Sequence, residues 1–252
     1  MTGSSTSESF EAIAPYYDLL MQSIPYLWWM HYVETLLEHF NRTAHKVLDL
    51  CCGTGNLSEL LALSGYEVVG VDKSPAMIEQ ARRKAAANHS GVRYYVQDAA
   101  QLQLNETFDL IVSLFDSLNY ITEPTEFAET MRRAHIHLNP EGVFIFDLNT
   151  EYAFVQKLFD QSLLEPNAPL RYRWRSQYDK QTRLCTVQME FWVREGEAER
   201  YFTETHVQRA YPEPEVRQML HDAGFPEVHT FDAYTLAPPT RRSDRIFYVA
   251  LR

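Results

Sequence analysis

Apolar residues follow a repeating order of strand and helix patterns between residues 46 and 149. Short, nearly continuous apolar runs alternate with longer segments in which apolar positions recur at helical spacing. The runs predict parallel strands that are buried on both faces, and the longer segments predict amphipathic helices. Elements that alternate in this way form a parallel sheet with right-handed crossovers. The predicted strands cover residues 47–50, 67–72, 92–98, 108–115 and 142–149.

Capping residues mark several helix boundaries. Ser74 and Pro75 predict the start of one helix, because serine accepts a backbone hydrogen bond at the N-cap and proline suits the first helical position. Pro25 similarly precedes an amphipathic segment, and Gly224 predicts the C-terminal end of a later helix. The predicted helices cover about residues 27–40, 57–63, 75–87, 124–137 and 213–225.

A different pattern occupies residues 170–210, where polar and apolar residues alternate and helix signals are lacking. This alternation predicts strands with two unlike faces, and turn-like joints at 179–181 and 195–197 predict three antiparallel strands. Two further strand patterns follow the last helix, at 227–235 and 245–252. We therefore expect an α/β fold with a seven-stranded, mostly parallel sheet and helices on both of its faces, plus a small antiparallel β insert.

Size and charge narrow the class of protein. The chain has 252 residues, of which 45% are hydrophobic, so it can bury a sizeable core without disulfides or a structural metal. Its net charge of −11 disfavours a nucleic-acid substrate, because phosphate backbones would be repelled. The densest basic run, Arg171 to Arg175, places its arginines on one face of a predicted strand, which we interpret as a solvated face.

Other compartment and metal signals are weak. The longest apolar runs fall short of the ~20 residues that span a bilayer, and the polar start MTGSSTSES has no apolar signal segment, so we expect a cytoplasmic protein without a membrane partner. We expect this polar leader to be disordered. Cys51, Cys52 and Cys185 form neither a CxxC pair nor a Cys/His cluster, so no metal site is predicted.

Candidate chemistry gathers at the ends of the first three strands. The segment KVLDLCCGTGNLS, residues 46–58, runs from a strand through a glycine loop into a helix, an arrangement that lets a ligand approach the backbone closely. Asp49, Asp72 and Asp98 stand at strand ends, separated by 72 − 49 = 23 and 98 − 72 = 26 residues. The carboxyl ends of parallel strands form one edge, where open α/β sheets bind ligands, so these acids are expected to meet there.

Two cofactors compete for this site. A dinucleotide such as NAD requires G-x-G-x-x-G and an acid about 20 residues further on, and Gly53, Gly55, Ser58 and Asp72 come close to that pattern. Asp49 favours a different cofactor, because a carboxylate at that strand end would repel a pyrophosphate. S-adenosylmethionine has no phosphate and carries a sulfonium cation, so nearby acids attract it.

At this point the sequence resembles a known family. VLDLCCGTG, the acid in GVDKSPAMIEQAR, the acid in QDAAQL and the segment FDLIVSLFDSLNYI are similar to class I S-adenosylmethionine-dependent methyltransferases, in the same order. The N-terminal YYDLLM and the β insert resemble the small-molecule branch of that family, which includes bacterial members of unknown substrate and sugar N-methyltransferases. The resemblance implies a Rossmann-like core at 46–150, with leader and lid helices at 1–45, a substrate-side insert at 151–212 and closing elements at 213–252.

The resemblance also implies roles for individual residues. Asp49 would lie beneath the methionyl group, Asp72 would accept bonds from the ribose hydroxyls, and Asp98 would accept one from the adenine amino group. Met77 would pack on the adenine, and Tyr17 would cover the site. The implied cofactor-binding set is Tyr17, Asp49, Gly53, Gly55, Asp72, Lys73, Met77, Asp98, Ala99 and Phe115.

The acceptor side is less defined. Methyl transfer is an in-line displacement in which the protein aligns the reactants and excludes water, and an amine acceptor must also lose a proton. Asp116, Tyr120 and Asp147 are the catalytic candidates, since they follow the fourth strand or end the fifth. Residues of the insert that would line a substrate pocket are Trp174, Phe191, Trp192 and His206.

The predicted function is therefore S-adenosylmethionine-dependent methylation of a small molecule at an amine or hydroxyl, with S-adenosylhomocysteine as product. A non-catalytic cofactor-binding or regulatory protein is the main alternative. An RNA methyltransferase is a weaker alternative. FDSLNY stands where DNA and protein amide methylases of this fold often carry a PPY-type tetrapeptide, which disfavours those two substrates. The partner is expected to be a small molecule, and both a monomer and a homodimer stay open.

Overall fold

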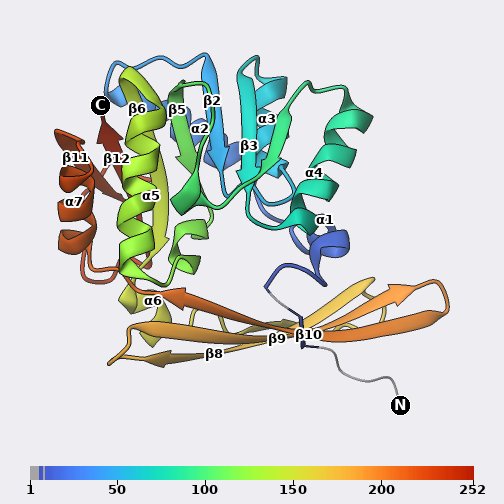
Figure 1. Cartoon of the computed structure of the whole chain (residues 1–252). Coiled ribbons are helices and arrows are strands. Elements are labelled where there is room, and N and C mark those ends of the chain that lie inside the picture. Colours follow the sequence, from blue (N-terminus) through green and yellow to red (C-terminus); the bar gives the residue numbers. More distant parts are fainter. Residues whose placement is uncertain (1–5, 8) are drawn as a thin grey trace.

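Two β-sheets organise the protein in the computed structural model, which describes residues 6, 7 and 9–252 (Figure 1). The larger sheet has seven strands in the order β11-β12-β6-β5-β2-β3-β4. Strand β12 pairs antiparallel with both neighbours, whereas the other pairings are parallel. The bounds are β2 Lys46–Leu50, β3 Glu67–Asp72, β4 Arg93–Val96, β5 Phe108–Ser113, β6 Leu138–Asn149, β11 Glu227–Asp232 and β12 Arg245–Leu251. The predicted seven-stranded, mostly parallel α/β sheet is confirmed.

Helices cover both faces of this sheet, as predicted. Strand β2 shows how alternation divides the core: Leu48 and Leu50 pack with α5 and α7, while Val47 packs with α2, α3 and α4 on the other face. Ser74 caps α4 as expected, its hydroxyl accepting the Met77 N–H at 3.3 Å. The helix bounds are α2 Tyr26–His39, α3 Asn56–Leu63, α4 Pro75–Asn88, α5 Pro124–His137 and α7 Glu213–Asp222.

The smaller sheet crosses beneath the carboxyl ends of the parallel strands (Figure 1). Its strands lie in the order β1-β10-β9-β8-β7, and β8 to β10 form the predicted antiparallel meander. The sequence predicted three strands here, and the structure adds two short ones at the edges. Strand β7 pairs antiparallel with β8, and β1 pairs parallel with β10. The bounds are β1 Thr6–Ser7, β7 Gln161–Leu163, β8 Leu170–Asp179, β9 Leu184–Glu195 and β10 Ala198–Arg209.

Two local expectations were wrong. Thr6 and Ser7 belong to the leader that we expected to be disordered, yet they pair with Thr203 and Glu204 of β10; residues 1–5 and 8 lie outside the described part of the chain. Residues 139–142, whose sequence Asn-Pro-Glu-Gly predicts a turn, are part of β6, with a register shift between Phe108 and Leu110 of β5 and a positive φ of 65° at Glu141. Leu138 and Val143, on either side of this segment, pair with Phe108 and Leu110.

Shorter helices lie in the segments between these elements. They are η1 Ala14–Tyr16, α1 Tyr17–Leu20, η2 Ala99–Gln101, η3 Ser117–Tyr120 and α6 Glu151–Val155. A third apolar cluster joins the N-terminal segment (Ile13 and Ala14) to Met77 of α4 and to the inner face of the smaller sheet. Across residues 6, 7 and 9–252, every helix is too short or too polar to cross a membrane.

Candidate functional site

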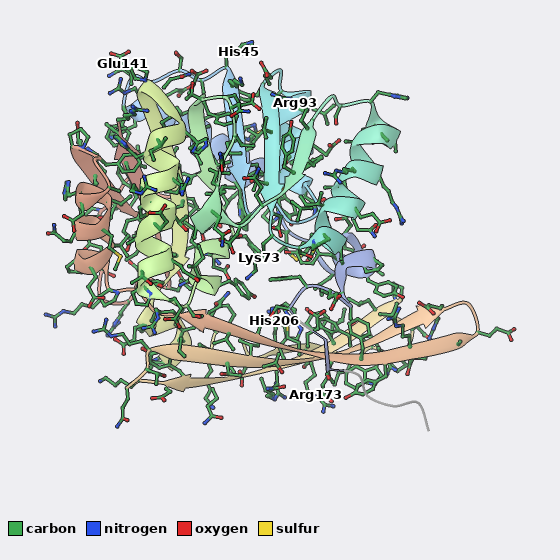
Figure 2. All side chains as sticks on the ribbon, viewed as in Figure 1. His45, Lys73, Arg93, Glu141, Arg173 and His206 are labelled. Atoms are coloured by element: carbon green, nitrogen blue, oxygen red, sulfur yellow. The ribbon has the colours of Figure 1, made fainter. Side chains whose placement is uncertain are left out.

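A cavity of about 580 Å³ lies between the carboxyl ends of the parallel strands and the smaller sheet. In Figure 2, Lys73 marks the end of β3 at this gap and His206 faces it from β10, while His45, Arg93 and Glu141 lie at the opposite edge of the large sheet. The predicted site residues that line the cavity are Tyr17, Asp49, Gly53, Asp72, Lys73, Met77, Asp98, Ala99, Phe115, Asp116 and Tyr120. Gly55 and Asp147, also predicted, lie behind this lining.

The glycine loop shapes the cavity wall after β2. Gly53 and Gly55 have φ values of +56° and +77°, which side chains rarely allow, so these positions need glycine. A Cβ on Gly55 would collide with Tyr94 of β4, whereas one on Gly53 would stand 4.0 Å from Tyr17. Gly55 therefore permits the close approach of a protein side chain, and Gly53 is the glycine that exposes backbone to the cavity.

Asp49 carries a buried carboxyl group and is the second-last residue of β2, just before this loop. It is 3% exposed and accepts a 2.5 Å hydrogen bond from Ser58 at the start of α3. Burial raises the pKa of Asp49 to about 7 from its usual value of 3.8, and the Ser58 hydrogen bond opposes that rise. A cation in the cavity would favour the ionised form.

The carboxylates of Asp72 and Asp98 accept hydrogen bonds from backbone N–H groups. Asp72 accepts the Gly53 N–H at 2.9 Å and the Ser74 N–H at 2.8 Å, so it ties the glycine loop to the start of α4. Asp98 caps η2 by accepting the Ala100 N–H at 2.8 Å. Each carboxylate oxygen has about two acceptor sites, so both residues retain capacity for a ligand.

The N-terminal segment covers the cavity from the side. Tyr17 of α1 lies over the glycine loop, and burial raises the pKa of its hydroxyl well above 10. Asp18 accepts a 2.6 Å hydrogen bond from Thr54 and pairs with Lys84 of α4 at 2.7 Å. These contacts hold the segment against the loop, which agrees with the covering position expected for Tyr17.

A buried ion-pair network shapes the loop after β5. Phe115 and Asp116 have φ values of +67° and +50°, and their backbone N–H groups donate to the two Asp147 oxygens at 2.7 and 2.9 Å. Arg245 of β12 pairs with Asp147 and, at 2.8 Å, with Asp116. Asp147, at 1% exposure, thus faces the loop backbone, and the structure gives it a positioning contact where we expected a catalytic one.

The inner face of the smaller sheet forms the remaining wall. Trp174, Phe191 and His206 line the cavity as predicted, and Tyr120 reaches His206 Nδ1 at 3.0 Å. Trp192 was predicted with them and lies instead on the outer face, where its ring packs at a tilt against Tyr201 and contacts Arg171 and Arg173. Neighbouring residues of a strand face opposite sides, so Phe191 and Trp192 could not both be right.

Three polar residues of the site were not predicted from the sequence. Glu204, Gln208 and Arg245 are joined to the site by hydrogen bonds: Glu204 to His206 at 2.9 Å, and Gln208 to Asp116 at 2.6 Å. A signal existed for two of them, since Phe202, Glu204, His206 and Gln208 occupy alternate positions of β10 and are all buried. Arg245 carried no local signal.

Comparisons with known proteins agree with this geometry. A family model described as "Methyltransferase domain" matches residues 47–142. The "Putative methyltransferase YqeM" of Bacillus subtilis is 32% identical over 96% of each chain. An S-adenosylmethionine-dependent methyltransferase of Clostridium acetobutylicum is 30% identical, with a TM-score of 0.84 over 96% of this chain and 98% of that one. The sugar N-methyltransferase KedS8 of Streptoalloteichus shares the fold, with a TM-score of 0.79 at 22% identity over 100% of this chain and 98% of that one.

The chain belongs to the S-adenosylmethionine-dependent methyltransferase family. The site's donor set fits the cofactor: carboxylates attract the sulfonium and ammonium groups, and a loop that exposes Gly53 lets the methionyl end approach. When bound, the cofactor supplies a methyl group that its sulfonium activates for transfer. Asp49, Asp72, Asp98 and Met77 line the cavity and are the residues that would hold it.

Proposed function

We propose that this methyltransferase modifies an amine or hydroxyl of a small molecule that is neutral or positively charged. The observation that carries the proposal is the shared cavity, in which the acid-lined cofactor wall faces the apolar and hydrogen-bonding wall of the smaller sheet. A volume of about 580 Å³ falls within the range of small-molecule pockets, about 300–1,000 Å³.

The charge of the lining supports this substrate class. The cavity is lined by the carboxyl groups of Asp49, Asp72, Asp98, Asp116, Glu126 and Asp244 against the cations of Lys73 and Arg245. Arg245 is already paired with two carboxylates. An anionic acceptor would therefore meet repulsion, whereas an amine would be attracted.

The outer face of the smaller sheet gives little support to an RNA substrate. Arg171 pairs with Glu199 at 2.5 Å, and Arg173 pairs with Glu190 at 3.3 Å. These carboxylates offset the basic run that could have held phosphates. The free thiols of the three cysteines suit a reducing compartment, so we also retain a cytoplasmic location within the proposal.

The test is transfer of labelled methyl from S-adenosylmethionine to a panel of small amines, phenols and alcohols. We expect turnover of at least one neutral or cationic acceptor and none of matched carboxylates or phosphates. Asp72→Ala is expected to weaken cofactor binding by about 1–3 kcal/mol, through lost charge-assisted hydrogen bonds, and to lower transfer accordingly. Tight cofactor binding with no transfer to any acceptor would favour the non-catalytic alternative.

A further inference from the structure

Three side chains, of which two are fully buried, form a hydrogen-bonded chain that begins at the cavity wall. Tyr120 of η3 meets His206 Nδ1 at 3.0 Å, and His206 Nε2 meets Glu204 Oε2 at 2.9 Å. His206 and Glu204 are 1% and 0% exposed. Tyr120 and His206 line the cavity, and Glu204 stands behind them. This order resembles a proton-accepting group backed by an imidazole and a buried carboxylate.

The hydrogen bonds at Glu204 define where the protons lie. Its oxygens accept backbone N–H groups of Phe10, Ala12 and Ile13 at 3.1, 2.9 and 3.1 Å, so the carboxylate acts as an acceptor. His206 Nε2 must then carry the proton that faces Glu204, and neutral His206 accepts at Nδ1 from the Tyr120 hydroxyl. Burial raises the pKa of Tyr120 well above 10, which agrees with a protonated phenol in that donating role.

Methylation of an N–H or O–H group releases a proton, which a group in the cavity wall can accept. On the basis of the proposed function, we propose that Tyr120 and His206 accept this proton and that Glu204 is a positioning residue for the imidazole. The acceptor's electron pair forms the new bond to the methyl carbon, and the carbon–sulfur pair stays on sulfur. The acceptor's proton moves to the Tyr120 oxygen as the Tyr120 proton moves to His206 Nδ1, and Glu204 stabilises the resulting imidazolium.

Glu204 also connects this chain to the covering segment. The three N–H groups that it accepts belong to the stretch immediately before η1 and Tyr17. Phe10 packs on the two ring-bearing members of the chain, with ring centroids 4.6 Å from His206 and 5.0 Å from Tyr120. The same carboxylate therefore orders the segment over the cavity and fixes the imidazole, so closure and proton acceptance depend on one residue.

The first experiment reads the imidazole directly. In ¹⁵N-labelled protein with S-adenosylhomocysteine, with the His206 signals assigned by their loss in His206→Gln, we expect the Nε2–H tautomer. Glu204→Gln is expected to lose this single tautomer and to speed hydrogen exchange at Phe10, Ala12 and Ile13. Thr205→Val, on the outer face of the same strand, is the matched control and should leave both readouts unchanged. A proton on Nδ1 in the wild type would overturn the proposal.

The second experiment measures turnover with an acceptor found in the transfer panel. Tyr120→Phe and His206→Gln are each expected to lower kcat about 10²–10⁴-fold, the usual contribution of acid–base catalysis, with less than threefold change in cofactor Kd. Glu204→Gln is expected to lower kcat and weaken cofactor binding together, and Glu204→Asp to recover part of both. A wild-type kcat in both Tyr120→Phe and His206→Gln would contradict the proposed proton-accepting chain and leave the proposed function standing. Failure of the wild-type protein to methylate any acceptor would instead contradict the proposed function itself.

Discussion

The two walls of the cavity are built in different ways. On the parallel sheet, Asp72 and Asp98 stand near strand ends and each accepts a backbone N–H two residues further along the chain, from Ser74 and Ala100. On the smaller sheet, the polar side chains are spaced two residues apart along β10 and bond to elements far away in sequence, such as Tyr120 and Phe10. The first wall thus depends on local loop geometry, and the second depends on how the two sheets meet.

This difference predicts which substitutions separate binding from folding. Changes in the loops of the parallel sheet should act mainly on cofactor binding, because these loops line the cavity and would hold the cofactor through short, local structures. The joint between the walls is where Gln208 of β10 bonds Asp116, which pairs with Arg245 together with Asp147. Changes there should act on the whole protein, because these buried charges are paired across long sequence separations.

The largest effect is expected at that joint. Arg245→Met would leave Asp116 and Asp147 buried without their cation, so we expect a loss of about 3–5 kcal/mol in the free energy of unfolding. Urea denaturation followed by circular dichroism measures it. Arg83→Met removes an exposed pair with Glu79 and is the control, with an expected change below about 0.5 kcal/mol. Equal losses in the two variants would show that the joint is not special.

The next effect tests the local wall. Gly55→Ala and Gly91→Ala both place alanine at a positive φ, +77° and +74°, which costs roughly 1–2 kcal/mol in each case. At Gly55 the new Cβ also overlaps Tyr94, which cannot swing away freely because its hydroxyl bonds Glu59 at 3.1 Å; at Gly91 nothing lies within 4 Å.

Overpacking at Gly55 should therefore add about 1–3 kcal/mol to the loss of unfolding free energy and weaken cofactor binding. Parallel denaturant titrations and calorimetry with S-adenosylhomocysteine give the two numbers. An equal loss of unfolding free energy in Gly91→Ala and Gly55→Ala would contradict this expectation.

The smallest effect concerns the charge of Asp49. Since burial raises its pKa to about 7, this carboxyl is largely protonated at pH 6 in the free protein and ionised at pH 8. A bound sulfonium favours the ionised form, so cofactor affinity should rise with pH across this window, by up to about tenfold, and level off above it.

Calorimetric Kd values for S-adenosylmethionine from pH 6 to 8 test whether the affinity rises with pH. Asp49→Asn should abolish the added slope, and subtraction of that variant removes the titration of the ligand's own amine. S-adenosylhomocysteine, which lacks the sulfonium charge, should show a weaker dependence. A slope that persists in Asp49→Asn would assign the titration to another group.

Much of the first wall could be predicted from sequence. Apolar runs and capping residues defined the seven-stranded sheet and its helices, and the regular spacing of Asp49, Asp72 and Asp98 placed them at one edge. These features are local, because a strand end, a glycine loop and an N-cap each involve only a few neighbouring residues. The exception was Gly55, whose local pattern predicted a ligand where the structure has Tyr94.

The second wall needed the tertiary structure. Alternation along β9 and β10 was visible in the sequence, yet nothing local states which face meets the cavity, and Trp192 of β9 was placed on the wrong face. Similarly, Asp147 was expected to act on the acceptor, and only its pairing with Arg245 and the Phe115 N–H showed that it holds a loop. The sequence by itself determined the sheet, its helices and the acidic edge, because backbone preferences and hydrophobic periodicity act over short distances. Which polar groups meet across the cavity was decided by tertiary packing, because burial pairs charges and hydrogen-bonding groups that lie far apart along the chain.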